Sequence, residues 1–320
     1  MRRPAHARPL HPSGVVGATL LALLVLATLL APWLSPRAPS EIDLRRRLEP
    51  PSWSEPFGTD ELGRSTLARV VHGGRVSLLA AALVALSAAV VGAALGGAAV
   101  ALGGRWEGLV MRVVDGLLVV PPLLLALAIV AVLGPGLAQA AIALVIAEAP
   151  TFARLTRSEL VVARERPFVE AAVAAGARPW RVVLRHLLPA AAGTLIVQVT
   201  LVTGFTVVAL SGVSFLGLGV QPPTADWGDM LARARGQLPG APWLALAPGV
   251  AVSAAVLGCN LLGDALRDAL GPPSAGGTTS SRGPTWRTLR AHDRSPHGRV
   301  GAIGSAAAAP TRASNLRDRA

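Results

Sequence analysis

The sequence has no lysine and only one cysteine. Without lysine it contains neither a Walker A phosphate-binding loop nor a Schiff-base lysine, and no other glycine-rich phosphate loop is present. The single cysteine, Cys259, excludes an intrachain disulfide and a CxxC metal or redox site, so we interpret it as a small buried apolar residue. Energy for any work by this chain must therefore come from another subunit or from a gradient.

Charged residues are also scarce. They make up 15% of the 320 residues, whereas 52% are hydrophobic. Soluble domains carry about 25% charged residues, so this composition predicts an integral membrane protein. The net charge of +12 comes from arginines beside apolar runs and not from a basic domain with aromatic platforms. Membrane topology explains this charge better than nucleic-acid binding does, and we expect no nucleic-acid partner.

The first 34 residues predict an uncleaved transmembrane helix. Residues 1–14 contain arginines and no acid, which indicates a cytoplasmic N-terminus. Residues 15–34 then supply about 20 apolar residues, enough to span a bilayer. This run is longer than a signal-peptide core of roughly 7–15 residues, and Pro32-Trp33 is a poor cleavage site.

Residues 35–75 predict an extracytoplasmic segment, because they are polar, rich in proline and mixed in charge. Within it we expect a surface helix over residues 59–73, capped by Thr59, with an apolar face toward the membrane. Asp60, Glu61 and Arg64 would lie at its start. They are either solvated there or help to pack this chain against another protein, and both interpretations stay open.

Further apolar runs predict five more transmembrane helices, at residues 76–102, 110–133, 137–152, 188–210 and 244–262. Gly92 and Gly96 have GxxxG spacing, which favours a close neighbour either within this chain or in a partner. Pro121-Pro122 would bend the third span and free backbone carbonyls there.

The segment between the last two spans, residues 213–243, would lie outside the cytoplasm. We expect a short helix in it over residues 226–237. Trp227 and Trp243 would occupy the aromatic belt at the membrane interface, in preference to a substrate contact.

Two acids fall inside predicted spans, where an ionisable residue is a functional candidate. Both lie near the cytoplasmic ends of their spans, which favours local ion pairs. We expect Asp115 to pair with Arg112, and Glu148 to pair with Arg154 or Arg157. A substrate contact by Asp115 and a gating role of Glu148 are the alternatives.

A charged island at residues 154–189 separates two strongly apolar regions and predicts a cytoplasmic helix-turn-helix. Gly176 suits the end of a first short helix, and Pro179 suits the first position of a second. The alanines around Ala171-Ala172 would let a partner approach closely, and Glu170 with the flanking arginines would form a charged rim. Compact packing of an alanine-rich turn is the simpler alternative.

This island contains Glu170-Ala171-Ala172, then Gly176 after three residues, then Leu188-Pro189 twelve residues after the glycine. The pattern resembles the EAA loop of permease subunits of ATP-binding-cassette importers, which sits in a cleft of the ATPase subunit. The resemblance covers residues 57–270. It points to the peptide and nickel branch through GTDELGR (58–64), SFLGLG (214–219) and QPPT-x-x-WG (221–228).

The resemblance implies two sets of site residues. The ATPase-coupling loop would use Glu170, Ala171, Ala172, Gly176, Pro179, Arg185, Leu188 and Pro189. The extracytoplasmic family signatures are Gly58, Thr59, Asp60, Gly63, Arg64, Ser214, Phe215, Gly217, Gly219, Pro222, Pro223, Trp227 and Gly228. Two positions depart from the family pattern, because Glu148 replaces an uncharged residue and Leu210 replaces a frequent glutamate.

The implied fold is an all-α polytopic membrane protein with six transmembrane helices, the type I importer permease fold. Its permease domain would cover residues 76–270 and the coupling loop 154–189. The implied partners are a second homologous permease, two ATPase subunits, an extracytoplasmic solute-binding protein and membrane lipid, with no cofactor, catalytic residue or metal. Peptides would be the cargo, with nickel or other small solutes as alternatives.

The loop at 154–187 holds seven arginines against three glutamates, so the positive-inside rule places it with both termini in the cytoplasm of a bacterium. Residues 271–320 lie beyond the family pattern, and their Gly, Ser, Ala and Arg composition predicts a disordered cytoplasmic tail. The competing function is a gradient-driven secondary transporter, which would need its own membrane-embedded acid. A membrane enzyme finds no support, since no Ser-His-Asp order or HExxH motif is present.

Overall fold

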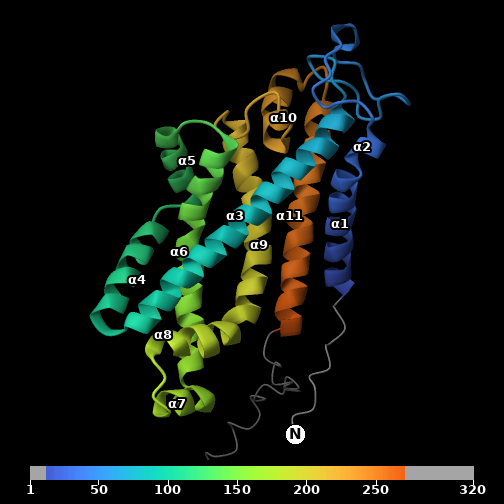
Figure 1. The fold of residues 1–320 in the computed structure, drawn as a ribbon. Coiled ribbons are helices and arrows are strands. Elements are labelled where there is room, and N and C mark those ends of the chain that lie inside the picture. The colour runs from blue at the N-terminus through green and yellow to red at the C-terminus, as the bar shows by residue number, and fades with distance from the viewer. Residues whose placement is uncertain (1–11, 271–320) are drawn as a thin grey trace, which may run out of the picture. The chain divides into compact units, whose positions relative to one another are not determined.

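The computed structural model describes residues 12–270, which belong to one compact unit, Met1–Pro272. The predictions of a cytoplasmic N-terminal segment and of a disordered tail fall on residues 1–11 and 271–320, outside the described part. Within residues 12–270 every regular element is a helix (Figure 1). The predicted all-α class is therefore confirmed.

Five helical stretches in the described part are long and apolar enough to cross a membrane: Pro12–Leu29, Thr66–Leu102, Leu137–Arg164, Pro179–Phe215 and Trp243–Leu270. They correspond to α1, α3, α6, the continuous run from α8 (Pro179–Val182) into α9 (Leu188–Phe215), and α11. A bent pair, α4 (Gly104–Leu118) with α5 (Pro122–Leu133), makes a sixth if it counts as one span. With this pair counted as one span, the described part has six spans, the number that the sequence predicts.

The third span is broken, where the sequence predicted a single bent helix. α4 and α5 meet at an angle of 89° across Pro121. Pro121 has no N–H, and Pro122 occupies the first turn of α5, where a missing N–H costs nothing. α4 therefore ends at Leu118 and lies almost perpendicular to α5. The predicted bend is present, but it divides the span into two separate helices.

The second span begins differently from the prediction. Residues 59–65 form a loop, and α3 starts at Thr66 with Ser65 as its N-cap, whose hydroxyl accepts a hydrogen bond from the Ala68 N–H. Thr59 instead accepts from the Glu49 N–H at 2.9 Å. The predicted surface helix over 59–73 is wrong, because Gly63 with φ of 72° interrupts it and Ser65 is the better-placed cap.

α3 and α6 cross closely at the predicted GxxxG pair. A Cβ on Gly92 or Gly96 would collide with the backbone of Ala149 or Ala153 on α6. The close neighbour of this pair is thus a helix of the same chain. Van der Waals packing of small residues, and not apolar burial, holds helices together in lipid.

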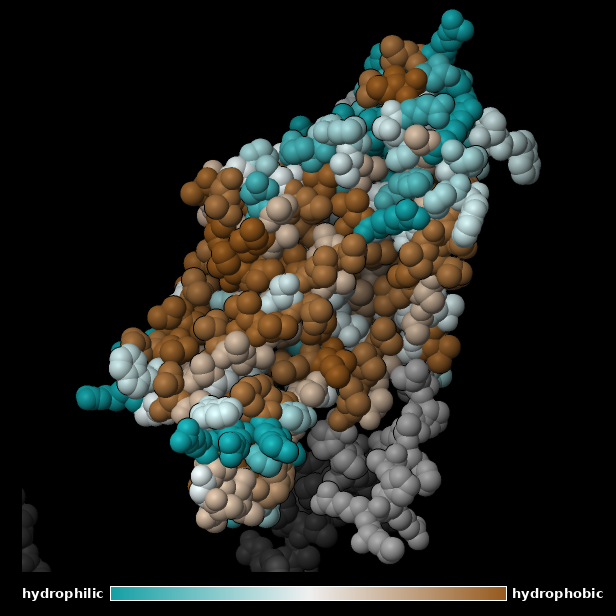
Figure 2. Space-filling model, in the orientation of Figure 1, coloured by the Kyte–Doolittle hydropathy of each residue, from teal (hydrophilic) through white to brown (hydrophobic). Residues whose placement is uncertain are grey.

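The lipid-facing surface is broad and apolar. Figure 2 shows hydrophobic side chains over the middle of the helices and hydrophilic ones at both ends. Large exposed side chains on α3 and α6 include Leu79, Leu83, Ile142 and Ile146, each at least 44% exposed. In water such a surface would drive aggregation, so the structure fits a chain that crosses a bilayer.

Candidate functional site

Loop 154–189 projects beyond one end of the long helices, opposite α10 (Trp227–Ala234; Figure 1). It consists of the end of α6, then α7 (Pro167–Ala174), then α8 and the π-helical turn η2 (Val183–Leu187). A buried apolar cluster anchors it to α3, α6 and α9: Val100, Leu160, Ala163, Val169, Val182, Val183, Leu187 and Ala191. The Arg164 guanidinium also donates a hydrogen bond to the Val100 carbonyl.

The outer face of this loop is uncovered. Val173, Trp180 and Leu184 are between 51% and 58% exposed, and Ala171, Ala174 and Ala175 are exposed between them. The guanidinium of Arg181 lies 5.7 Å from the centre of the Trp180 ring, a cation-π distance. The face is an apolar knob with a rim of charges that includes Glu170 and Arg185, both exposed.

The turn between the two short helices depends on Gly176. Its φ is 77°, and its N–H donates to the Val173 carbonyl at 2.9 Å, while the Ala177 N–H reaches the Ala172 carbonyl at 3.1 Å. This arrangement closes α7 in the manner of a glycine C-cap. No atom lies within 4 Å of a Cβ built on Gly176, so a side chain there would meet backbone strain and no clash.

The second half of the loop is continuous with the fifth span. Pro179 is the first residue of α8, and helical backbone then runs through the π turn and Leu188-Pro189 into α9. Pro189 follows the π turn and lacks the N–H that would continue the helical hydrogen bonds, and it is the one proline inside the run Pro179–Phe215 after its first residue. The knob is thus attached to a membrane helix without a flexible joint.

Two ion pairs tie α4 to α6 next to the loop. The Arg157 Nε lies 2.9 Å from Glu107 Oε1, and the Arg154 Nη1 lies 3.7 Å from Asp115 Oδ1. The prediction that Asp115 pairs with Arg112 is therefore wrong. The chain breaks sharply after α4, and α4 packs against α6, which carries Arg154.

Glu148 also departs from its predicted role. It is 4% exposed, its Oε1 has no hydrogen-bond partner, and both arginines expected to pair with it bind other acids. Position 148 is about two and a half turns before Arg157 in α6, and its side chain is buried inside the helix bundle instead of lying at the membrane interface.

The first family signature, residues 58–64, lies at the other end of the molecule in what we call the cap, residues 35–65 and 216–242. Thr59, Asp60 and Arg64 are 0%, 6% and 4% exposed. Asp60 accepts from the Arg64 N–H at 3.0 Å and from its Nε at 2.6 Å, and from the Leu62 N–H at 2.9 Å. The carboxylate thus closes a tight loop, and the solvated helix start considered above is excluded.

The second signature, residues 221–228, packs directly against α3. Asp226 caps α10 (Trp227–Ala234) by accepting from the Gly228 and Asp229 N–H groups, and it accepts from the Ser77 hydroxyl at 2.7 Å. Trp227 is 1% exposed and donates its indole N–H to the Val70 carbonyl at 2.9 Å. Its predicted place in the interfacial belt is therefore wrong, because the indole is buried against α3 beside Val70 and Gly74.

A chain of ion pairs joins the two signatures. Arg69, 2% exposed, lies 3.7 Å from Asp60 and 3.4 Å from Asp229. Arg233 bridges Asp229 at 2.9 Å and Glu61 at 3.3 Å. The hydrogen bond that Arg233 donates to Asp229 raises the pKa of Arg233 above its ordinary value, so this cation stays charged.

Glu55 forms a second centre of the cap. It is 2% exposed and accepts from Arg37, from Arg46 at 3.1 Å and from the Ser65 hydroxyl at 2.7 Å. The Ser65 contact links this centre to the start of α3.

The SFLGLG signature ends α9. Gly217 has φ of 78°, and the Ser214 hydroxyl accepts from the Val220 N–H at 3.2 Å. Gly219 lies against Ser214 and Gly228 against Ser211, both too closely for a side chain. Phe215, Pro222 and Pro223 are exposed. The glycines of this signature are therefore explained by close packing and turn geometry.

Sequence reasoning missed several residues of the cap and of α3 that hold the signatures: Glu55, Arg69, Ser77, Asp226 and Asp229. Arg69 carried a signal, since an arginine within an apolar stretch calls for a buried partner. Asp226 carried another, because Asp before a helical segment is a preferred N-cap. Ser77 carried none.

The described residues thus form a membrane-spanning helix bundle with an uncovered knob at one end and a cap held by buried ion pairs at the other, an architecture that suits a membrane subunit working with partner proteins. The family described as "Binding-protein-dependent transport system inner membrane component" matches residues 77–273, and the chain belongs to this family. The N-terminal TM domain of oligopeptide transport permease C matches residues 11–51. The chain is a multi-pass inner-membrane permease subunit of an ATP-binding-cassette importer and not an enzyme, because a separate subunit hydrolyses ATP.

Curated relatives are similar over most of their length. The di/tripeptide transport system permease protein DppC of Pseudomonas aeruginosa is 43% identical over 269 residues, 82% of this chain and 89% of the relative. The probable D,D-dipeptide transport system permease protein DdpC of Escherichia coli is 38% identical, over 83% and 89%. The glutathione transport system permease protein GsiD of Escherichia coli is 40% identical, over 82% and 87%. An ATPase and a substrate-binding protein are partners of permeases of this family.

Proposed function

We propose that loop 154–189 docks in a cleft of an ATPase subunit and transmits its movement to the membrane helices. The observation that carries this proposal is the combination of an uncovered apolar knob with a helix that continues without interruption into α9. The knob needs a partner, because its exposed Val173, Trp180 and Leu184 lie beyond the apolar middle of the bundle. The continuous helix gives that partner a mechanical connection to the span.

The loop residues divide into two roles under this proposal. Gly176 sets the angle between α7 and α8, and Pro179 starts α8. Glu170 and Arg185 supply charge at the rim for polar groups of the ATPase. Ala171 and Ala172 keep the surface low enough for close approach.

Two variants test the coupling role. Gly176→Val places a β-branched residue at φ of 77° and should misplace the knob without any clash. Glu170→Lys reverses one charge of the rim. Both should insert and assemble in the membrane, yet lose bound ATPase on purification, or leave ATP hydrolysis unstimulated by loaded binding protein in reconstituted membranes.

Matched controls separate docking from general damage. Gly134 also has a left-handed φ, 88°, and open space around it, and it lies in the turn before α6 away from the loop. Gly134→Val should keep the ATPase. Glu41→Lys makes the same charge reversal in the exposed cap. If both loop variants keep the ATPase and full stimulated transport, the loop is not the coupling element.

The complete importer under this proposal contains a second, homologous permease, two ATPase subunits and an extracytoplasmic solute-binding protein. The translocation path then lies between the two permeases. Mass measurement of the intact purified complex tests this composition, and a complex with one permease chain would contradict it.

Peptides are the proposed cargo. The support is that relatives at 38–43% identity are named for di/tripeptide, D,D-dipeptide and glutathione transport. Binding measurements on the cognate solute-binding protein, with dipeptides, tripeptides and Ni²⁺ as ligands, test this assignment. Selective binding of Ni²⁺ would overturn it.

The proposed orientation places loop 154–189 and both termini in the cytoplasm and the cap outside. Its support is the excess of arginine over glutamate in the loop. In a Cys259→Ala background, a membrane-impermeant maleimide should label Trp53→Cys on spheroplasts, because Trp53 is fully exposed in the cap. Labelling of Gly176→Cys on the same intact spheroplasts would contradict the orientation.

A further inference from the structure

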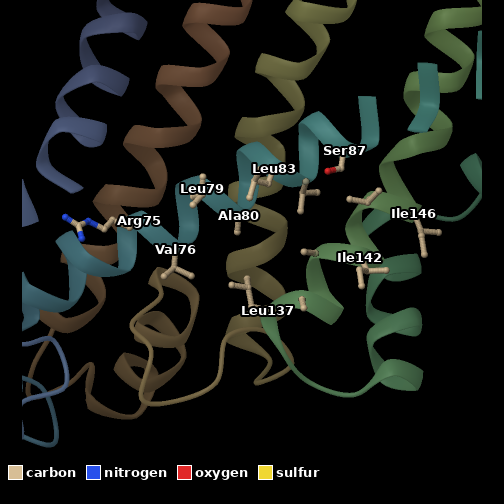
Figure 3. A pocket seen from close by; sticks show the side chains of 13 residues that line it. Arg75, Val76, Leu79, Ala80, Leu83, Ser87, Leu137, Ile142 and Ile146 are labelled. Atoms are coloured by element: carbon tan, nitrogen blue, oxygen red, sulfur yellow. The ribbon is translucent and has the colours of Figure 1, made fainter. Parts of the chain in front are cut away.

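A groove of about 790 Å³ opens on the membrane-facing side between α3 and α6 (Figure 3). The two helices touch at Gly92 and Gly96 and diverge toward their N-terminal ends. Of the 13 lining residues, only Arg75 and Ser87 are polar. The groove is thus an apolar channel along the bundle surface with one charge.

The groove has the length of a lipid chain. From Arg75 to Ser87 it follows α3 for about 18 Å, at about 1.5 Å per residue. One leaflet of a bilayer has a hydrocarbon depth of about 15 Å. A single acyl chain therefore fits along the groove when its headgroup lies near Arg75.

Arg75 stands at the correct level for such a headgroup. Its Nε donates to the Thr28 carbonyl at 2.6 Å and its Nη2 to the Leu29 carbonyl at 2.9 Å, and Leu29 is the last residue of the first span. Figure 3 shows the arginine beside α1 at one end of the row of groove side chains. Both acceptors are neutral, and within residues 12–270 Arg75 forms no ion pair.

A second, smaller hollow lies beside the groove. It has about 260 Å³ and shares Val76 with the groove, and three of its seven lining residues, Ser40, His72 and Thr224, have polar side chains. Along α3 the order is therefore a hollow with some polar side chains, a cation without an ion pair and an apolar groove. An amphiphile with a polar head, a negative phosphate and a long chain has the same order of parts.

We propose that an anionic phospholipid of the cap-side leaflet binds here as a structural ligand. One acyl chain lies in the groove against Leu79, Leu83 and Ile142, the phosphate pairs with Arg75, and the head enters the hollow at His72. Charge complementarity favours this occupant over a helix of the second permease, because an apolar helix would cover Arg75 without neutralising it.

The test uses the assembled importer, purified in mild detergent and analysed by native mass spectrometry for retained phospholipid. Arg75→Gln removes the charge but keeps donors for the two α1 carbonyls. Ala138→Trp fills the groove from an exposed position on α6. We expect each variant to reduce the retained phosphatidylglycerol at least fivefold.

The controls make the same chemical changes elsewhere. Arg105→Gln removes an exposed arginine of α4 that forms no ion pair with any residue of the described part, and Val132→Trp adds an indole on α5, where Val132 is 86% exposed. Both should retain phosphatidylglycerol as the unmodified importer does. Equal retention in all four variants would overturn the proposal.

A second measurement does not depend on retention in detergent. In the Cys259→Ala background, the Ser87→Cys thiol should react at least threefold more slowly with a membrane-soluble maleimide in phosphatidylglycerol vesicles than in phosphatidylcholine vesicles. Arg75→Gln should abolish the difference. A headgroup-independent rate, or cross-linking of this thiol to the second permease by a bifunctional maleimide, would show that no anionic lipid occupies the groove.

Discussion

The two ends of this molecule use charge in opposite ways. At the cap end, Asp60, Arg64 and Glu55, together with Arg69 of α3, are buried and paired within the chain. In loop 154–189, Glu165, Glu170 and six of the seven arginines are exposed, and apolar anchors beneath them are buried. Charges that satisfy one another stabilise a fixed shape, whereas charges left on the surface are available to another protein.

The two ends also attach differently to the bundle. The cap is joined to α3 at Arg69 and Val70 and again about two turns further along at Ser77. The loop continues two helices, α6 and α9, and otherwise rests on an apolar cluster and on the polar contacts of Arg154, Arg157 and Arg164. We therefore expect cap substitutions to lower stability and loop substitutions to leave stability nearly unchanged while they uncouple the importer.

The largest loss of stability is expected for Arg69→Met. It leaves Asp60 and Asp229 with one fewer cationic partner in a buried site, and breaking a buried pair in this way costs about 3–5 kcal/mol. Thermal unfolding of the purified permease should show it. Replacement of Arg105 by Met is the control, and an equal shift in both variants would remove the distinction between the ends.

Asp226→Ala should have a smaller but clear effect. It removes the N-cap of α10 and the acceptor for the Ser77 hydroxyl, and the loss of a cap residue alone costs about 1 kcal/mol. Because the bond from Ser77 is to a charged group, we expect about 2–3 kcal/mol in total. Asp226→Asn keeps the capping oxygen and should recover part of this loss.

Arg157→Gln tests the link between α4 and α6 beside the loop. Its pair with Glu107 is partly exposed, and such pairs contribute about 0.2–1 kcal/mol. A double-mutant cycle with Glu107→Gln measures the coupling energy directly. A value near that of a buried cap pair would mean that the loop end is locked as firmly as the cap.

Glu170→Lys should have the smallest effect on stability, within about 0.5 kcal/mol, since this residue is exposed. Its effect on ATPase binding should nevertheless be complete. Comparison of its unfolding temperature with that of the Arg69 variant measures the difference in stability effect between the two ends of the molecule. A large destabilisation by Glu170→Lys would contradict that difference.

Local pattern was enough to predict the helices and the turn at Gly176, because both depend on residues close in sequence. Long apolar runs identify the spans, and the Gly176-x-x-Pro179 spacing identifies where one short helix ends and another begins. The GxxxG pair predicted close packing but not its partner, since α3 and α6 are far apart in the chain.

The missed features depend on contacts between distant segments. Trp227 appeared interfacial because hydropathy cannot show that Val70 offers a carbonyl to its indole. The ion pairs of Asp115 and Arg157 required knowledge of the break at Pro121, which turns α4 against α6. The helix start at Ser65 was missed because Thr59, earlier in the chain, is also a residue type that caps helices well. Only the left-handed backbone of Gly63 between them prevents a helix from starting at Thr59.

The π turn at Val183–Leu187 has a mechanical consequence for the junction between loop and membrane. A π turn holds more residues than an α turn. If this segment changed to α geometry, the displaced residue would rotate α8 by about 100° about the helix axis relative to α9 and shift it by about 1.5 Å. The π turn thus holds one residue more than an α turn at this junction. Its conversion to α geometry would combine a short shift of the knob along the helix axis with a rotation of the knob relative to the span.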